Sequence, residues 1–182
     1  MSTLEHPPRS AEIALQTSTL HAEFTLWLND EAQLLDRHRY REWLALMADE
    51  LRYRVPGRVE LTRDGGDGIS DRSFHLDENL ASMTTRIRRI TEATNFAENP
   101  RTRTRRFVTN IRLEPTTTSA AIEGTSYLLL TRSRGLGSDL ELLSCERRDR
   151  LVRDEAGGLR LAGRIVIVDQ ATLGLVHLGT PL

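Results

Sequence analysis

The chain has 182 residues, with 25 basic and 26 acidic side chains and a formal net charge of −1. Every basic residue is Arg, which excludes lysine Schiff-base chemistry, and the single cysteine, Cys145, excludes an internal disulfide and suits a reducing cytoplasm. No apolar run approaches the roughly 18–20 residues of a membrane span, and no secretory signal is visible at the start. We therefore expect a cytoplasmic protein that does not enter a membrane.

The N-terminal third predicts an arm followed by two helices. Residues 1–17 are polar and contain Pro7-Pro8, so we expect a flexible arm there and one domain over residues 18–182. From Ser18 the apolar residues have helical spacing: Leu20, Phe24, Trp27, Leu28, Leu34 and Leu35. A second, short helix carries Tyr40, Trp43, Leu44 and Met47 on one face. We expect both tryptophans to lie in the core rather than against a ligand.

The central third predicts a strand, a loop and a helix. Leu51, Tyr53 and Val55 alternate with arginines, and we expect Pro56-Gly57 to end that strand. The glycine-rich stretch within residues 57–75 predicts a surface loop, and it lacks the Lys-Ser/Thr pair of a phosphate-binding loop. A helix should follow Asp77-Glu78, with Leu80, Met83, Ile87 and Ile90 on its apolar face.

The C-terminal half predicts one long antiparallel sheet. Its apolar residues alternate with polar ones over about 107–113, 119–132, 139–153 and 159–170, and Arg153–Gly158 is typical of a hairpin turn. Helices that precede a sheet in this order favour an α+β fold, with the N-terminal helices packed on one face of a long, bent, mainly antiparallel sheet.

Charge is separated along the chain. Residues 86–112 contain eight arginines and two acids, a formal +6, whereas residues 1–50 contain four arginines and nine acids, a formal −5. Such a separation predicts a basic surface that binds a partner, with a solvated basic loop as the alternative. Nucleic acid is an unsuitable partner, because the net charge is near zero and the segment offers too few aromatic side chains for base stacking.

The residues suggest little chemistry of their own. The five histidines are scattered, so we expect no metal site, and one cysteine cannot supply a Rieske cluster, which needs two Cys and two His ligands. Cys145 is expected to be a small structural residue. An interior pocket is the remaining possibility, with His38, Asp49, Tyr53 and Asp169 as candidate acid–base residues. Alternatively, His38 and Asp49 face solvent and Tyr53 packs in the sheet.

Three blocks carry a resemblance to a known family. They are Glu31–Leu46 with Tyr53-Arg54-Val55-Pro56, then Phe96–Ile111, and finally Arg164–Ala171. The chain resembles the small (beta) subunit of bacterial aromatic-ring-hydroxylating dioxygenases, which are Rieske non-heme iron oxygenases. The middle block is the most specific, because it matches the family stretch Trp-Ala-Glu-Asp/Asn-Pro followed by Ser/Thr-Arg and Val-x-Asn-Val. The resemblance covers most of residues 20–171.

The resemblance implies a cystatin-like, NTF2-like cone and a structural role in aromatic compound catabolism. In this family the catalytic alpha subunit carries the Rieske [2Fe–2S] cluster and the mononuclear iron, and the assembly is commonly alpha-three, beta-three. We therefore expect no cofactor and no catalytic residue in this chain. The alternative function is a stand-alone NTF2-like pocket enzyme, such as an isomerase, dehydratase or cyclase, which would need a buried acid with a raised pKa.

The basic stretch is the expected contact with the rest of such an assembly. Side chains alternate along a strand, so Arg103 and Arg105 should share one direction while Arg106 points to the other face. Arginine forks pair bidentately with carboxylates, and such pairs strengthen where an interface excludes water. The predicted interface residues are Asn99, Pro100, Arg101, Arg103, Arg105 and Arg106, and their partner is either the catalytic subunit or a neighbouring beta subunit.

Overall fold

The structure is a computed structural model. It describes residues 11–59, 68–92, 102–114, 121–135, 139–170 and 180–182, with side chains from residue 17 onward. The helices of this part of the chain are α1 (Ala11–Asp36), α2 (Tyr40–Leu44) and α3 (Leu80–Thr91). The strands are β1 (Met47–Arg58), β2 (Ile69–Asn79), β3 (Arg103–Leu113), β4 (Ala121–Ser133), β5 (Glu141–Arg153) and β6 (Leu159–Val168). No described helix is long and apolar enough to cross a membrane.

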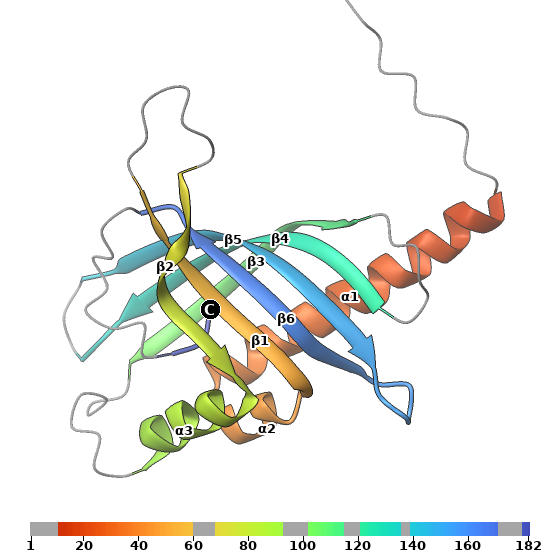
Figure 1. Ribbon diagram of the computed structural model, residues 1–182. Helices are drawn as coiled ribbons and strands as arrows, with labels where there is room; N and C mark the ends of the chain where they lie inside the picture. Colours follow the sequence, from red (N-terminus) through yellow and green to blue (C-terminus); the bar gives the residue numbers. More distant parts are fainter. Residues whose placement is uncertain (1–10, 60–67, 93–101, 115–120, 136–138, 171–179) are drawn as a thin grey trace, which may run out of the picture.

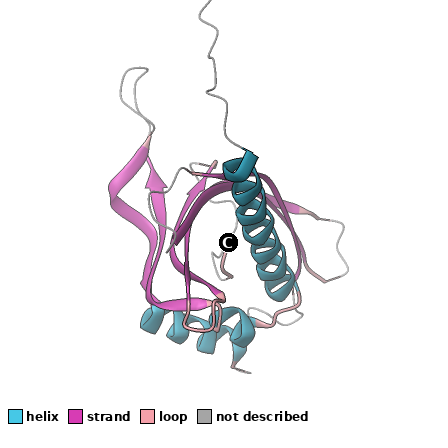
Figure 2. Cartoon of the chain, turned by 90° about the vertical axis from the view of Figure 1, so that its right-hand side faces the viewer, coloured by secondary structure: helices cyan, strands magenta, loops and turns pink. Residues whose placement is uncertain are grey.

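The six strands form one sheet in the order β2-β1-β6-β5-β4-β3 (Figure 1). Every neighbouring pair is antiparallel except β1 and β6, which are parallel. The sheet is strongly curved, and α1 runs along its concave side, while α2 and α3 lie together at one end (Figure 2). The predicted α+β layout, with helices on one face of a bent and mainly antiparallel sheet, is confirmed.

Helix α1 is held against the sheet by one apolar stripe. Phe24, Leu28 and Leu35 are almost fully buried, as the three- and four-residue spacing predicted. The helix begins at Ala11, earlier than the start predicted at Ser18, so residues 11–17 of the predicted arm are helical. Residues 1–10 of the predicted arm lie outside the described residues.

The first two strands differ from the prediction. Strand β1 begins at Met47, which was expected in the second helix, and it continues through Pro56 to Arg58. Pro56 is tolerated because it lies at a register irregularity, opposite Phe74, where the ladder of hydrogen bonds is already interrupted. Strand β2 was predicted as a loop; its residues are mostly polar because it is an edge strand whose two faces are only half-buried or exposed.

Helix α3 was predicted correctly except for its start. Asn79, not Asp77-Glu78, caps it: the Asn79 side chain accepts a hydrogen bond from the Ser82 N–H, and the Ser82 hydroxyl accepts one from the Asn79 N–H. This reciprocal pair satisfies two backbone donors at the helix start. Met83 and Ile87 are the buried residues of this helix.

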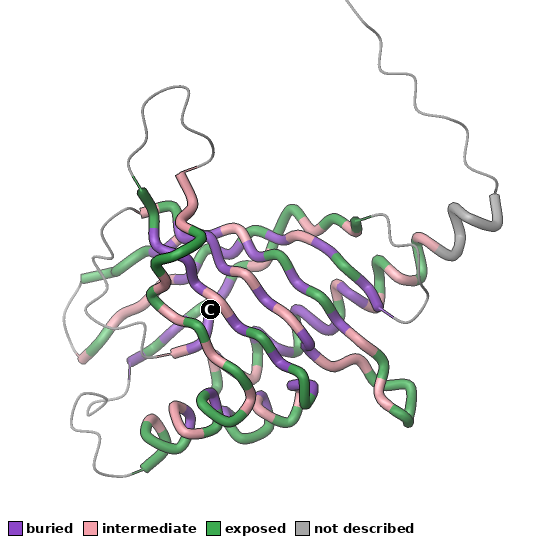
Figure 3. Tube along the Cα trace, viewed as in Figure 1, coloured by how far each residue is buried: buried purple, intermediate pink, exposed green. Residues whose placement is uncertain are grey.

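Burial alternates along the sheet, as Figure 3 shows for β4 and β5. The inward side chains meet α1, and the outward side chains face solvent. Gly124 of β4 is required at one such contact, because a Cβ atom there would lie 2.9 Å from the Phe24 ring and 2.6 Å from the Arg112 carbonyl oxygen. The absence of a side chain allows the helix to approach the sheet at this point.

Candidate functional site: the interior of the cone

The space between the curved sheet and α1 contains charge. Four ionisable side chains from three elements are almost fully buried there: Glu31 of α1 at 0% exposure, Arg147 and Asp149 of β5 at 0% and 4%, and Arg164 of β6 at 1%. Buried charges are rarely left unpaired, because removing an ion from water is costly. We refer to these four residues as the interior charge cluster.

Arg164 is the centre of the interior charge cluster. Its guanidinium donates to both carboxylate oxygens of Glu31, at 2.6 and 2.8 Å, and to both carboxylate oxygens of Asp149, at 2.6 and 3.0 Å. The planar fork of arginine can bind two carboxylates in this way, whereas a lysine ammonium group cannot. Arg164 therefore joins α1, β5 and β6, and its partners raise its pKa against the effect of burial.

Glu31 receives further donors. The Trp43 indole N–H donates to Glu31 Oε1 at 3.0 Å, and Arg147 Nη1 donates to Glu31 Oε2 at 3.3 Å. Burial alone would raise the pKa of Glu31, but the charges of Arg164 and Arg147 and these hydrogen bonds outweigh it and hold the pKa below its ordinary value of 4.5. Glu31 is therefore ionised at neutral pH and serves as a structural anion, not as a proton donor.

Tyr53 brings the last residues of the sequence into this interior. Its hydroxyl donates to the Leu182 backbone oxygen at 2.7 Å and accepts from the Leu182 N–H at 2.9 Å, while Arg164 donates to the same oxygen at 3.0 Å. Figure 2 shows the C-terminal residue within the curve of the sheet. Burial raises the pKa of Tyr53 to about 12, so the hydroxyl keeps its proton at neutral pH.

A second buried ion pair, between Arg106 and Asp36, holds Pro181, the residue before Leu182. Arg106 of β3 forms an ion pair with Asp36 at 2.7 Å, and its other terminal nitrogen donates to the Pro181 carbonyl oxygen at 2.7 Å. The Thr104 hydroxyl also donates to Asp36, at 3.2 Å. Pro181 and Leu182 are consequently held from β1, β3 and β6 together.

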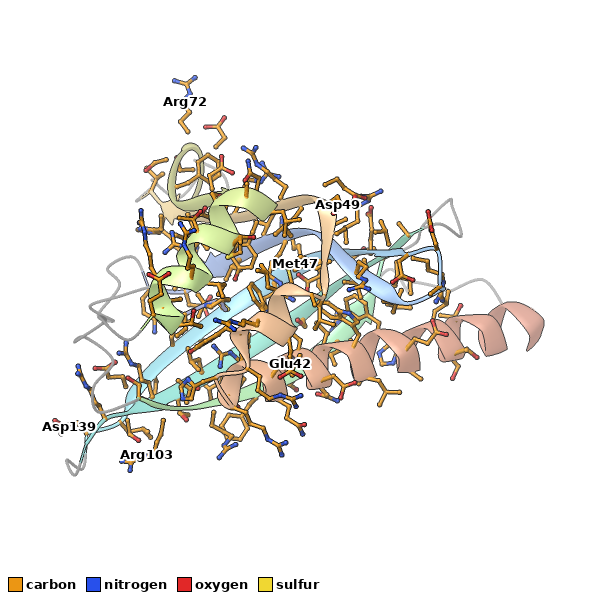
Figure 4. All side chains as sticks on the ribbon, turned by 90° about the horizontal axis from the view of Figure 1, so that it is seen from below. Glu42, Met47, Asp49, Arg72, Arg103 and Asp139 are labelled. Carbon is orange, nitrogen blue, oxygen red and sulfur yellow. The ribbon has the colours of Figure 1, made fainter. Side chains whose placement is uncertain are left out.

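The structure does not bring the predicted pocket candidates together. Tyr53 lies inside the cone, but His38 is half-buried at the end of α1 and shares a hydrogen bond of 3.0 Å with the Tyr40 hydroxyl. Asp49 is exposed on β1 (Figure 4), and exposed Asp169 accepts a hydrogen bond from the Ser144 hydroxyl at 2.6 Å. Of these four candidates, Tyr53 alone is buried in the interior of the cone, so the four do not form one acid–base site.

Cys145 is buried at 2% exposure in β5, and burial raises its pKa to about 12. Because the thiolate is the reactive form, we expect Cys145 in the folded protein to react with a thiol-specific disulfide reagent at least tenfold more slowly at pH 8 than in urea. The absorbance of the released thiolate, followed over time with and without urea, measures both reaction rates. Equal rates in the two conditions would contradict the burial of this side chain.

The predicted partner-binding arginines separate as their alternation required. Arg103 and Arg105 are exposed and point in the same direction. Arg106 is buried and forms its ion pair with Asp36 of the same chain, so the prediction that it belongs to the interface is wrong. Figure 4 shows Arg103 pointing away from the body of the molecule, and its guanidinium donates to Ser133 Oγ at 3.2 Å and to the Gly135 carbonyl oxygen at 2.8 Å. Asn99, Pro100 and Arg101 lie outside the described residues.

The expected basic surface is smaller than the charge count implied. Besides Arg106, Arg86 is neutralised by Glu78 at 2.5 Å, and Arg88 lies 3.7 Å from Glu92. Arg103 and Arg105 are exposed at the start of β3, whereas Arg112 is exposed near its other end and Arg89 is exposed on α3. The exposed arginines of this segment are therefore divided between separate places.

The same outward face carries apolar side chains next to the arginines. The outer apolar patch consists of Phe107, Tyr127, Leu129 and Leu142, exposed at 53%, 48%, 39% and 54%. Phe107 is directly opposite Leu129 in the sheet, and Arg105 is opposite Thr131, which is in turn opposite Leu142. Phe107 and Leu129 are therefore adjacent on this face, and large exposed apolar side chains that gather in this way are candidates for an interaction surface.

The opposite end of this face carries both acidic and basic side chains. A shallow depression of about 470 Å³ is lined by Glu114, Glu123, Gly124, Thr125, Glu146, Arg148 and Asp149. Glu146 pairs with Arg148 at 2.7 Å and Glu123 with Arg150 at 3.6 Å, and Glu114 is exposed beyond the end of β3. The outward face thus has an arginine end, an apolar middle and an end at which Glu146 and Glu123 pair with Arg148 and Arg150.

The interior charge cluster was missed by the sequence reasoning, although a signal was present. Glu31 falls on the buried stripe of α1, three residues after Leu28 and four before Leu35. Arg147 and Asp149 occupy the inward phase of β5, in line with Leu143, Cys145 and Leu151. Charged residues in an apolar phase indicate a buried ionic network, whose pairing only the fold can reveal. Among the described residues, no group of three or more His, Cys, Asp or Glu side chains could hold a metal ion.

Comparisons with known proteins identify the relatives of this chain. The family model described as "Ring hydroxylating beta subunit" matches residues 30–174. The chain is 34% identical over 170 residues to the benzene 1,2-dioxygenase subunit beta of Pseudomonas putida, which covers 91% of this chain and 88% of the relative.

Solved structures agree on the fold. A chain of naphthalene 1,2-dioxygenase, in a structure with indole bound in the active site, superposes with a TM-score of 0.80 at 26% identity and covers 97% of this chain and 95% of its own. A protein from Novosphingobium aromaticivorans described as a scytalone dehydratase has a TM-score of 0.61 at 13% identity, covering 86% of this chain and 89% of its own. The second similarity concerns the fold alone and confirms the NTF2-like cone.

Proposed function

The chain belongs to the family of ring hydroxylating beta subunits, and we propose that its own role is structural: it assembles with an iron-bearing alpha subunit of an aromatic-ring-hydroxylating dioxygenase. The observation that carries this role is the filled interior of the cone. The interior charge cluster and Leu182 occupy the place where a pocket enzyme of this fold would bind a substrate.

The filled interior also weighs against the alternative of a stand-alone pocket enzyme. Such an enzyme would need a buried acid with a raised pKa, and Glu31, the fully buried acid of α1, has a lowered one. The interior contains charged side chains, and these are paired with one another.

The redox chemistry of such an enzyme is assigned to the partner. A Rieske cluster needs two cysteine and two histidine ligands, and this chain contains one cysteine, which is buried. The residues of this chain therefore do not fit the cluster. We place both the cluster and the mononuclear iron in the alpha subunit, and we place the assembly in the cytoplasm, where a single reduced cysteine is stable.

We propose that copies of this chain meet through the outward face in an alpha-three, beta-three assembly. The arginine end at Arg105 and the paired charges around Glu123 are separated by roughly 25 Å along β4, because strands rise about 3.3 Å per residue. A second copy rotated about a three-fold axis can place exposed Glu114 near the arginine end of the first copy, with the outer apolar patch between them. Such head-to-tail contacts close into rings.

Co-expression tests the proposed role. The neighbouring reading frame should encode an alpha subunit with Cys-x-His and Cys-x2-His ligand pairs, and a tagged copy of this chain should retain that protein through size-exclusion chromatography. Light scattering then gives the mass of the complex. Recovery of this chain as a free monomer beside a fully assembled alpha subunit would contradict the proposal.

Replacing Arg103 and Arg105 together by alanine should weaken the association of beta subunits by about tenfold at low salt. The loss should shrink as salt increases, because ions screen charge pairs at an interface rim. Sedimentation velocity of the assembled complex over a dilution series measures the change. The matched control is Arg72→Ala, another exposed arginine that lies on β2 at the far edge of the sheet.

The outcome of the double substitution separates three cases. A complex that loses mass while the isolated variant keeps its melting temperature supports the copy-to-copy contact. A complex that keeps its beta–beta association but releases the alpha subunit assigns the arginines to the other interface. Unchanged affinity in the double variant would show that these arginines are solvated and that the interface lies elsewhere.

A further inference from the structure

The interior of the cone has the features of a ligand site, and the last residues of the sequence occupy it. Leu182 is 2% exposed and belongs to the hydrophobic core. Its backbone N–H donates to the Tyr53 hydroxyl, and its backbone oxygen accepts from Tyr53 and Arg164. The Pro181 oxygen accepts from Arg106. A dipeptide-sized unit is thus bound both by its polar backbone and by an apolar side chain.

The groups that bind this unit are held in place without it. Arg164 also makes four bonds to Glu31 and Asp149, and Arg106 also pairs with Asp36, and none of these contacts involves residues 181–182. Tyr53 is fixed in β1 at 0% exposure, with its ring 5.9 Å from the Arg164 guanidinium carbon. A site whose donors are fixed by other contacts loses little freedom when it binds, which favours affinity.

The site also has unused donor capacity. Arg147, fully buried in the same cluster, has an Nη2 atom with no hydrogen-bond partner, and the Nε atom of Arg106 is likewise unpartnered. Each of these two buried nitrogens can donate to one further acceptor atom.

We propose that the cone interior is a binding site for short aliphatic acyl groups, such as an N-acylated amino acid, which residues 180–182 occupy within the same chain. The ligand class follows from the contacts: an oxygen that accepts from Tyr53 and Arg164, an amide N–H that donates to Tyr53, and a branched aliphatic side chain in the core. The chain's own segment blocks the site because it is present at the high effective concentration of a tethered ligand.

The test uses the peptide acetyl-Thr-Pro-Leu and a chain shortened to end at Gly179. At a hundredfold excess over its dissociation constant, the peptide should raise the melting temperature of the shortened chain by about 5–10 °C and leave the full chain unchanged. If the shortened chain is unfolded alone, the same titration should restore its far-ultraviolet circular dichroism. The peptide acetyl-Thr-Pro-Glu is the matched control, since its extra carboxylate cannot enter the apolar part of the site.

Two variants give independent readouts. Tyr53→Phe in the shortened chain removes the hydroxyl and should lower the affinity for the peptide by about tenfold without altering the fold. Leu182→Glu in the full chain should expel the segment and make the full chain respond to acetyl-Thr-Pro-Leu. A peptide that stabilises neither the shortened chain nor the Leu182→Glu variant overturns the proposal, as does one that stabilises the unaltered full chain equally.

Discussion

Replacing Glu31 with glutamine is expected to lower the free energy of unfolding at pH 7 by about 3–5 kcal/mol, the range for breaking a buried ion pair by removing one partner. The substitution keeps the size of the side chain but leaves Arg164 and Arg147 with one carboxylate, Asp149, between them. Urea denaturation followed by tryptophan fluorescence measures the loss. Asp30→Asn is the matched control, because Asp30 is the neighbouring acid of α1 and is exposed.

The effect of Glu31→Gln should depend on pH in a defined direction. The pKa of Glu31 is lower in the folded protein than the ordinary 4.5, so its carboxylate stabilises the fold fully above that pH. The contribution is lost as the pH falls below 4.5 through the folded value, where the wild-type side chain also becomes neutral. The gap between wild type and variant should therefore narrow in acid. Two results would contradict the proposed role of Glu31. One is a difference in the free energy of unfolding that stays constant from pH 7 to pH 3, and the other is a loss at pH 7 no larger than that of Asp30→Asn.

Replacing Trp43 with alanine should lower the free energy of unfolding by about 3–5 kcal/mol, since it removes the largest fully buried side chain of the described residues and leaves a cavity where α2 meets α1. Trp43→Phe keeps most of the volume and removes the indole N–H that donates to Glu31, so it should cost about 1.5–3 kcal/mol. The two variants separate packing from hydrogen bonding. Thermal unfolding measures both.

Fluorescence gives an independent check on the tryptophans. Trp43 and Trp27 are 0% and 8% exposed, so the native protein should emit at short wavelength and shift to longer wavelength on unfolding. The matched surface control for the alanine variant is Leu26→Ala, at 63% exposure, which should change stability little. Solvent-exposed tryptophan emission from the native protein would show that the cone is not closed as described.

The spacing of apolar residues predicted the helices and strands that bury one continuous apolar face. The stripe of α1, the apolar face of α3 and the alternation in β4 to β6 each arise from residues close in sequence, so period alone revealed them. The pattern failed at β1 and β2 for two physical reasons. A register irregularity permits Pro56 inside a central strand. The edge strand β2 is half-buried or exposed on both faces, so its sequence shows no alternation of apolar and polar residues.

The site was less predictable because its members are far apart in the sequence. Glu31 and Arg147 are separated by 116 positions, and nothing local distinguishes a buried arginine from a solvated one. Tyr53 was placed in the interior correctly, but its partner there is the backbone of Leu182, not an acid–base group. The exposed directions of Arg103 and Arg105 could be predicted because strand alternation is a local property.

The most direct test of the proposed role is an iron determination on separated subunits. The complex of this chain with its alpha subunit should contain iron in proportion to the alpha subunit, while this chain, purified alone under anaerobic conditions with added ferrous iron and sulfide, should contain none. Metal analysis by mass spectrometry and the visible absorption of an iron–sulfur cluster read both quantities. Stoichiometric iron in the isolated chain would contradict the assignment of a structural subunit.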